Sequence, residues 1–228
     1  MINIFVQARM TSKRLPGKVL KELCGKYILQ HITERVSHKF GNNKMVILTS
    51  DHSTDLPIVK FAEEHNLNIY RGSLENVYER FKNAIQKYKP DCFVRVCGDS
   101  PLIDTGLIEE AINIYKNNKA DLVTNVFPRS FPKGQSVEVI KTSSFLSDEF
   151  TKCSSFSKEH VTSSFYSNEK KFDIINIECT SKNLVQDLAV DSEEDFLKIE
   201  KYLQDNNFDY PKFSSNKFNM INKSAKDA

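Results

Sequence analysis

The segment INIFVQARMTSKRLPGKVL carries an apolar run, Ile2–Val6, that leads directly into a strongly basic stretch. Arg9, Lys13, Arg14 and Lys18 place four cations within ten residues. An arginine can bind phosphate through two parallel hydrogen bonds, and a lysine supplies a point charge. Backbone N–H groups of such a loop can add further donors. The stretch therefore suits an anionic ligand with several charges, although a merely solvated basic loop has the same composition.

This basic stretch differs from other phosphate-binding loops, because neither G-x-x-x-x-G-K-[ST] nor G-x-G-x-x-G occurs in it. The whole chain has a net charge of only +2, which argues against a nucleic-acid partner. No apolar run approaches the roughly 20 residues of a membrane span, and no basic segment precedes the apolar start as in a signal peptide. We therefore expect a cytoplasmic protein without membrane or nucleic-acid partners, whose five scattered cysteines are reduced thiols.

Polar residues also accompany two later apolar runs. Asp99 follows the run Cys92–Val96, and a carboxylate in a turn at a strand end is well placed to bind a metal ion. A Gly-Asp turn without any ligand is the alternative. Arg95 lies inside the run and needs a partner for its charge. Asn125 follows the next run at Leu122–Val123 and could contact a ligand from there.

The elements that position these residues follow from hydrophobic periodicity. Apolar runs of strand length alternate with segments in which apolar residues recur every three or four positions. This alternation predicts an α/β domain with a largely parallel sheet, whose ligands bind at the carboxyl ends of the strands. The runs are Ile2–Val6, Met45–Leu48, Cys92–Val96 and Leu122–Val123, and the helical segments span Ile28–Val36, Val77–Tyr88 and Leu107–Tyr115.

The second half of the chain is less regular. SVEVIK (136–141) and KFDIINIEC (171–179) are typical of strands, and their connections predict an antiparallel or mixed edge of the sheet. SEEDFLKIEKYL (192–203) predicts a helix with Ser192 as N-cap and Asp195 in a near capping box. We expect one domain over residues 1–211 and a polar, disordered tail over 212–228.

The order of residues in the basic stretch carries a family resemblance. QARMTSKRLPGKVL (7–20) resembles the opening signature of the cytidylyltransferases that activate acidic sugars, the CMP-Kdo and CMP-sialic acid synthetases. Gln before Ala-Arg resembles more closely the spore-coat polysaccharide biosynthesis branch. Three further motifs occur in the family's order and extend the resemblance over roughly residues 1–205: YRGSLENVYERF (70–81), VRVCGDSPLID (94–104) and LAVDSEEDF (188–196).

The resemblance implies a Rossmann-like nucleotidyltransferase fold, with a mostly parallel mixed sheet sandwiched by helices, and a nucleotide site. Arg9, Lys18 and Asp99 would be its catalytic residues. Asp99 and Asp191 would bind Mg²⁺, with Glu193, Glu194 and Asp195 as competitors of Asp191. Arg14 could instead form a structural ion pair, and Arg71–Ser73 could be an ordinary turn. The implied nucleotide-binding residues are Gln7, Ala8, Arg9, Ser12, Arg14, Lys18, Arg71, Gly72, Ser73, Arg95 and Asp99.

The implied acceptor side departs from the family pattern. The acceptor-binding residues would be Asn125, Ser136, Glu138 and His160, but Ser136 stands where the family has an aspartate. His160 would touch the substrate across a dimer interface, or would pack as a helix histidine. Because the departures fall on this side, the sequence does not name the acceptor.

The function implied is a CTP-dependent nucleotidyltransferase of the EC 2.7.7 type. It would transfer CMP to an acidic sugar or related acid for surface polysaccharide biosynthesis, release pyrophosphate and act as a homodimer. One alternative is a phosphate or phosphonate acceptor, and another is a non-catalytic nucleotide-binding module. A sugar-phosphate nucleotidyltransferase using another nucleotide is disfavoured by the missing G-G-x-G-[ST]-R-L opening.

Overall fold

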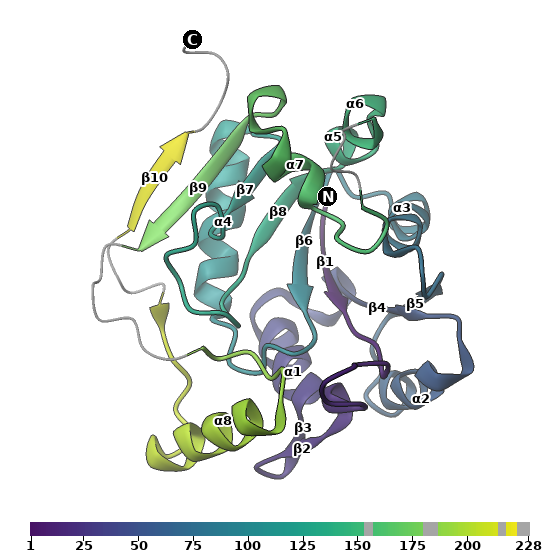
Figure 1. Ribbon diagram of the computed structural model, residues 1–228, viewed down its shortest axis with the longest axis vertical. Helices are drawn as coiled ribbons and strands as arrows, with labels where there is room; N and C mark the ends of the chain where they lie inside the picture. The colour runs from purple at the N-terminus through teal and green to yellow at the C-terminus, as the bar shows by residue number, and fades with distance from the viewer. Residues whose placement is uncertain (153–156, 180–186, 214–217, 223–228) are drawn as a thin grey trace.

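An eight-stranded sheet forms the centre of the molecule (Figure 1). The computed structural model describes residues 1–152, 157–179, 187–213 and 218–222. The strand order in the sheet is β10-β9-β7-β8-β6-β1-β4-β5, and β2 and β3 form a separate hairpin. The strands are β1 Ile2–Gln7, β2 Glu22–Leu23, β3 Lys26–Tyr27, β4 Met45–Ser50, β5 Ile69–Gly72, β6 Cys92–Cys97, β7 Leu122–Thr124, β8 Glu138–Lys141, β9 Ile174–Cys179 and β10 Phe218–Asn222.

The first half of the chain builds the parallel part of the sheet. β1 pairs in parallel with β4 on one side and with β6 on the other, so that Val6 lies between Ile47 and Val96. β4 is buried along its whole length, as expected for a parallel strand covered on both faces. The strands predicted from the four apolar runs are confirmed as β1, β4, β6 and β7. The predicted α/β class with a largely parallel sheet is confirmed as well.

The second half supplies the antiparallel strand pairs. The prediction of a mixed sheet is confirmed, but the position of β8 at an edge is wrong. β8 lies between β6 and β7 and is antiparallel to both, so its backbone is paired along both edges. β9 is parallel to β7, and β10 closes the edge antiparallel to β9.

β10 lies within the segment that the sequence placed in a disordered tail. Residues 218–222 pair with β9 and satisfy the backbone groups along an edge that would otherwise be open. For these five residues the structure differs from the prediction. The parts of the expected tail at 214–217 and 223–228 lie outside the described residues.

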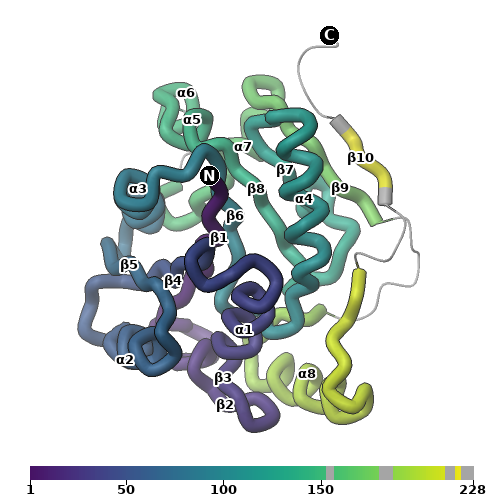
Figure 2. Tube along the Cα trace, turned by 180° about the vertical axis from the view of Figure 1, so that it is seen from behind, coloured from purple at the N-terminus to yellow at the C-terminus, as the bar shows by residue number. Residues whose placement is uncertain are grey.

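Helices cover both faces of the sheet and give three layers, as Figures 1 and 2 show from opposite sides. α1, α2 and α4 bury their apolar faces with Ile4 and Val6 on one side. α3 and the short α5–α7 pack against Phe5 and Phe93 on the other. The helices are α1 Ile28–Phe40, α2 Leu56–Glu64, α3 Val77–Tyr88, α4 Thr105–Asn118, α5 Thr142–Phe145, α6 Asp148–Thr151, α7 Ser163–Ser167 and α8 Glu193–Asp205.

The last helix, α8, begins where the sequence predicts it. Ser192 is its N-cap, and Ser192 and Asp195 form the two reciprocal hydrogen bonds of a capping box. Phe196 and the preceding Val190 pack in a third apolar cluster that also contains Leu23. This cluster ties the chain just before α8 to the hairpin that follows the basic loop.

Two expectations from composition can be compared with the structure. Across the described ranges, no helix combines the length and apolar character needed to cross a bilayer. Cys24, Cys92, Cys97 and Cys179 are free thiols. Cys153 lies outside the described residues.

Candidate active site

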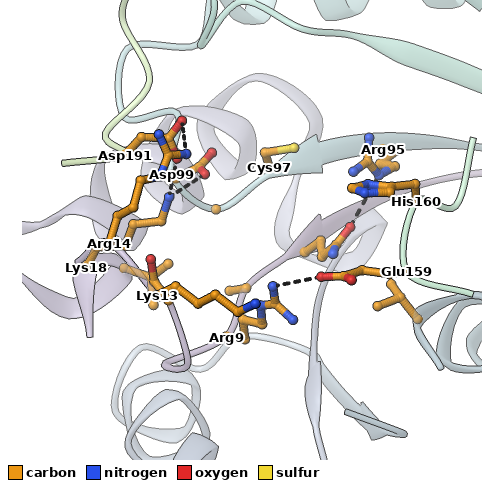
Figure 3. Close-up of a pocket in the computed structure, with 16 residues that line it drawn as sticks. Arg9, Lys13, Arg14, Lys18, Arg95, Cys97, Asp99, Glu159, His160 and Asp191 are labelled. Atoms are coloured by element: carbon orange, nitrogen blue, oxygen red, sulfur yellow. Dashed lines mark hydrogen bonds and ion pairs between the residues drawn. The ribbon is translucent and has the colours of Figure 1, made fainter. Parts of the chain in front are cut away.

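A cavity of about 440 Å³ opens where the carboxyl ends of β1 and β6 meet (Figure 3). This is the edge at which open parallel sheets bind their ligands. The four cations of the basic loop, Arg9, Lys13, Arg14 and Lys18, line it together with Asp99, so the loop and the strand-end carboxylate share one cavity. The lining residues are Gln7, Ala8, Arg9, Ser12, Lys13, Arg14, Lys18, Val19, Val77, Arg95, Cys97, Gly98, Asp99, Glu159, His160 and Asp191.

A buried carboxylate fixes the shape of the basic loop, which carries Arg9, Lys13, Arg14 and Lys18. The Met10 N–H donates to Asp55 Oδ1 over 2.7 Å, and Asp55 Oδ2 accepts from Thr49 and Ser50 at the end of β4. Gly17 has φ of +73°, a left-handed conformation that favours glycine, and its N–H donates to the Met10 carbonyl over 2.8 Å. Asp55 therefore positions the loop, and no motif in the sequence analysis pointed to it.

Lys18 lies at the centre of the site as a buried ammonium. Its Nζ donates to Asp99 Oδ2 over 2.7 Å, to Asp191 Oδ1 over 2.9 Å and to the Val190 carbonyl over 2.8 Å. The side chain is only 10% exposed, whereas the two carboxylates are 27% and 32% exposed and face the cavity. The predicted metal-binding pair is thus brought together around one cation, as Figure 3 shows.

The ion cluster shifts the pKa values of Lys18 and Asp191 in opposite directions. Burial lowers the pKa of Lys18, but the charges and hydrogen bonds of Asp99 and Asp191 outweigh burial, so its pKa is raised. Burial raises the pKa of Asp191, but Lys18 and Arg14 outweigh that effect and its pKa is lowered. Both changes favour the charged forms, so the ion cluster is stable at neutral pH.

The donor set around Lys18 fits a divalent cation. Two carboxylate oxygens and one backbone carbonyl oxygen converge on a single point. Mg²⁺ prefers oxygen ligands and usually takes one or two carboxylates, with substrate phosphates and water completing its shell. Within the described ranges, no group of three or more His, Cys, Asp or Glu side chains could hold a metal by itself. The site therefore suits a metal ion that arrives with a phosphate ligand.

Two further arginines of the loop are paired with carboxylates of the same cavity. Arg14 Nη2 lies 2.9 Å from Asp191 Oδ2, and Arg9 Nη2 lies 3.2 Å from Glu159 Oε1. The structural ion pair considered for Arg14 is thus present, at a carboxylate that lines the site. Glu159 was not predicted from the sequence, because no sequence pattern identifies an acidic residue that pairs with a basic loop.

Arg95 has the partner that its place in an apolar strand required. Its Nη1 lies 2.6 Å from Glu138 Oε2, and its Nε donates to Gln7 Oε1 over 3.3 Å. The Tyr166 hydroxyl donates to the other Glu138 oxygen. Burial and the Glu138 charge raise the pKa of Tyr166 well above its usual range. Glu138, predicted to bind the acceptor, is 4% exposed and instead neutralises Arg95.

The side chains of the predicted base-binding segment form hydrogen bonds with the backbone at the end of β4 and at the start of α3. Arg71 donates to the carbonyls of Ser50 and Asp51 over 3.2 and 2.7 Å. The Ser73 hydroxyl accepts from the Asn76 N–H, and Gly72 packs closely against the α3 residue Arg80. None of Arg71, Gly72 and Ser73 is among the described residues that line the cavity, and Arg71 and Gly72 lie in strand β5, so base binding by this segment stays a prediction.

Two of the predicted acceptor residues, Asn125 and Ser136, form hydrogen bonds within the protein. Asn125 donates to the Gln135 carbonyl over 2.7 Å and accepts from the Val137 N–H over 2.9 Å. The Ser136 hydroxyl accepts from Arg129 over 3.1 Å. Of the four predicted acceptor residues, only His160 lies among the described residues that line the cavity.

Comparisons with known proteins identify the family of this chain. The family model described as "Cytidylyltransferase" matches residues 3–216. An uncharacterized protein of Methanocaldococcus jannaschii is 31% identical over 173 residues, which span 76% of this chain and 70% of that protein. The spore coat polysaccharide biosynthesis protein SpsF of Bacillus subtilis is 34% identical over 124 residues, spanning 53% of this chain and about half, 52%, of its own length.

Solved structures share the fold. A cytidylyltransferase from Leptospira borgpetersenii superposes with a TM-score of 0.79 at 24% identity, covering 90% of this chain and 94% of that one. A CMP:2-keto-3-deoxy-manno-octonic acid synthetase complexed with CTP superposes with a TM-score of 0.66 at 16% identity, covering 90% and 99%. The Rossmann-like nucleotidyltransferase fold is therefore confirmed. With the family model matching nearly the whole chain, this protein belongs to the cytidylyltransferase family of nucleotidyltransferases.

Proposed function

We propose that this protein binds CTP together with Mg²⁺, transfers CMP to a small acidic acceptor and releases pyrophosphate. The observation that carries the proposal is the cavity at the ends of β1 and β6, where the cations of one loop meet Asp99 and Asp191. Nucleotidyl transfer needs a held triphosphate, neutralised charge and an aligned nucleophile more than it needs covalent catalysis. Cations that line the cavity could hold and neutralise the triphosphate, and we propose that the rest of the lining aligns the nucleophile.

The chain's own residues account for binding and alignment. Arg9, Arg14 and Lys18 supply positive charge to the triphosphate, and the Asp55 anchor keeps their loop in shape. A bound Mg²⁺ at Asp99 and Asp191 would further neutralise the phosphates. An acceptor oxygen, whose proton is released to solvent, then attacks the α-phosphorus, the bond from this phosphorus to the bridging oxygen breaks, and its electron pair leaves with pyrophosphate.

The acceptor is proposed to be an acid because two side chains with N–H groups, Arg95 and His160, line the other side of the cavity. Arg95 and His160 both line it, and Figure 3 shows them well away from Lys18. A carboxylate, phosphate or phosphonate would suit this end. Relatives named as 3-deoxy-manno-octulosonate cytidylyltransferases and as a spore coat polysaccharide biosynthesis protein support an acidic sugar of a surface polysaccharide. The homodimer and the cytoplasmic location stay predictions.

Thermal unfolding with nucleotides tests the proposal. The protein is melted with ATP, GTP, UTP or CTP, each with and without Mg²⁺. A ligand that binds only the native state stabilises it by about 2.7 kcal/mol at a hundredfold excess over its Kd. We expect the largest rise in Tm with CTP and Mg²⁺, followed by pyrophosphate release when an acidic sugar is added. A rise with another nucleotide would contradict the choice of CTP. Binding without any turnover over a panel of acids would favour the non-catalytic module.

A further inference from the structure

The ammonium of Lys18 has no donor left for a phosphate in the described structure. An ammonium has three N–H donors. Lys18 directs them to Asp99, Asp191 and the Val190 carbonyl, with N···O distances of 2.7, 2.9 and 2.8 Å. The side chain is also 10% exposed, so water contributes little to its solvation. To reach a triphosphate, Lys18 has to release at least one of these partners.

The carboxylates are equally committed. Asp191 uses one oxygen for Lys18 and the other for Arg14, and Asp99 is held by Lys18. The position where both carboxylates could bind a divalent cation is the position that the Lys18 nitrogen fills. Two cations cannot share it, because they would repel each other at contact distance. Arg9 repeats the arrangement with Glu159 at the far side of the loop.

We propose that Lys18 is a built-in counterion that occupies the metal position until nucleotide arrives, so that nucleotide and metal bind by exchanging partners. The triphosphate takes over Lys18 and its neighbouring arginines, and the metal takes over Asp99 and Asp191. This inference rests on the proposed function and adds the order in which the site is filled. It also explains why cations and carboxylates occur together in a cavity meant for an anion.

The energetics of the exchange make the two ligands interdependent. A metal ion alone has to expel a buried ammonium that then lacks an anionic partner, which is costly. A triphosphate alone removes the cation from two neighbouring carboxylates and leaves them to repel each other. Together the ligands leave no charge unpaired. Metal and nucleotide therefore bind with positive coupling, and linkage requires each to strengthen the other by the same factor.

The first test measures Mn²⁺ binding to the nucleotide-free protein. Electron paramagnetic resonance gives the concentration of free Mn²⁺ during the titration. We expect wild type to bind Mn²⁺ weakly and Lys18→Met to bind one ion at least about tenfold more tightly, because the competing ammonium is gone. Lys21→Met is the matched control. Lys21 pairs with Glu193 away from the described cavity lining, so this variant should match wild type. Adding Asp99→Asn to Lys18→Met should abolish the gain.

Equal Mn²⁺ affinity in wild type and Lys18→Met would overturn the proposal, and so would a gain that survives Asp99→Asn. The second test needs no variant and covers the case in which Lys18→Met fails to fold. Wild type is melted with Mg²⁺, with α,β-methylene-CTP, and with both. We expect the combined rise in Tm to exceed the sum of the separate rises. Additive rises would overturn the exchange while leaving CTP binding intact. No rise with the nucleotide, alongside a metal site gained in Lys18→Met, would overturn the proposed function alone.

Discussion

The two ends of the cavity hold their charges in different ways. At the end of the cavity where we propose that the nucleotide binds, Lys18 is paired with Asp99 and Asp191, which are 27% and 32% exposed and lie in loops. At the end proposed for the acceptor, Arg95 is paired with Glu138, which is 4% exposed and lies within the sheet. Arg95 and Glu138 are also neighbours in the register of β6 and β8, so their backbones are fixed relative to each other.

The difference separates charges that can change partners from charges that build the site. Loop carboxylates that face a cavity can be taken over by a ligand, because water and ligand both reach them. Glu138 lies inside the sheet and has almost no such access, and its loss would leave the Arg95 charge uncompensated. We therefore expect substitutions at the nucleotide end to affect chemistry first and substitutions at Glu138 to affect stability first.

The largest effect is expected for Asp99→Asn. The change is nearly isosteric and removes one of the two carboxylates proposed to bind the metal. Metal stabilisation of transition-state charge amounts to several kcal/mol, so kcat for pyrophosphate release should fall about a thousandfold. The unfolding midpoint in urea should stay close to that of wild type. Activity near the wild-type level would show that Asp99 does not bind the metal. It would also contradict the expectation that substitutions at this end of the cavity affect turnover first.

Glu138→Gln is expected to act mainly on the fold. It leaves the Arg95 guanidinium without its carboxylate partner, and breaking a buried pair in this way costs about 3–5 kcal/mol. Urea denaturation at neutral pH measures the loss, with Glu63→Gln on the exposed side of α2 as control. If Glu138→Gln kept wild-type stability and only raised the KM for the acceptor, Glu138 would be a substrate contact, as the sequence predicted.

The ion cluster at Lys18 should give a pH-dependent contribution to stability. The pKa of Lys18 is raised from 10.5, so its contribution is complete below pH 10.5 and is lost as pH rises through the folded-state pKa. The pKa of Asp191 is lowered from 3.8, so its contribution is complete above pH 3.8 and is lost as pH falls through the folded-state pKa. The stability difference between wild type and Lys18→Met should therefore be flat between these limits. A difference that disappears near neutral pH would contradict the cluster.

The smallest effect is expected for Ser136→Ala. The Ser136 hydroxyl accepts a hydrogen bond from Arg129 at the surface and is not among the described residues lining the cavity. Surface substitutions of this kind change stability by less than about 0.5 kcal/mol. Steady-state kinetics should give an unchanged KM for the acceptor. A several-fold rise in that KM would place Ser136 at the acceptor after all.

Much of the fold could be predicted from local pattern. The apolar runs of β1, β4 and β6, the helical spacing of α3 and the N-cap of α8 are properties of short segments, so the sequence contains them in full. The insertion of β8 between β6 and β7 could not be predicted, because it depends on which distant strands pair. The strand β10 could not be predicted either, since its five residues, FNMIN, lie in a polar stretch of the chain and pair with an edge strand supplied from elsewhere.

By itself, the sequence determined which loop carries the positive charge and which carboxylates follow the strands, because these are matters of residue type and order. Only the tertiary structure decided how those charges are used. Lys18 meets carboxylates that lie 81 and 173 residues away, whereas Arg71 donates to the backbone carbonyls of Ser50 and Asp51 at the end of β4. The packing of the whole sheet decides which side chains meet. That packing depends on contacts between residues far apart in the sequence, and no single motif contains them.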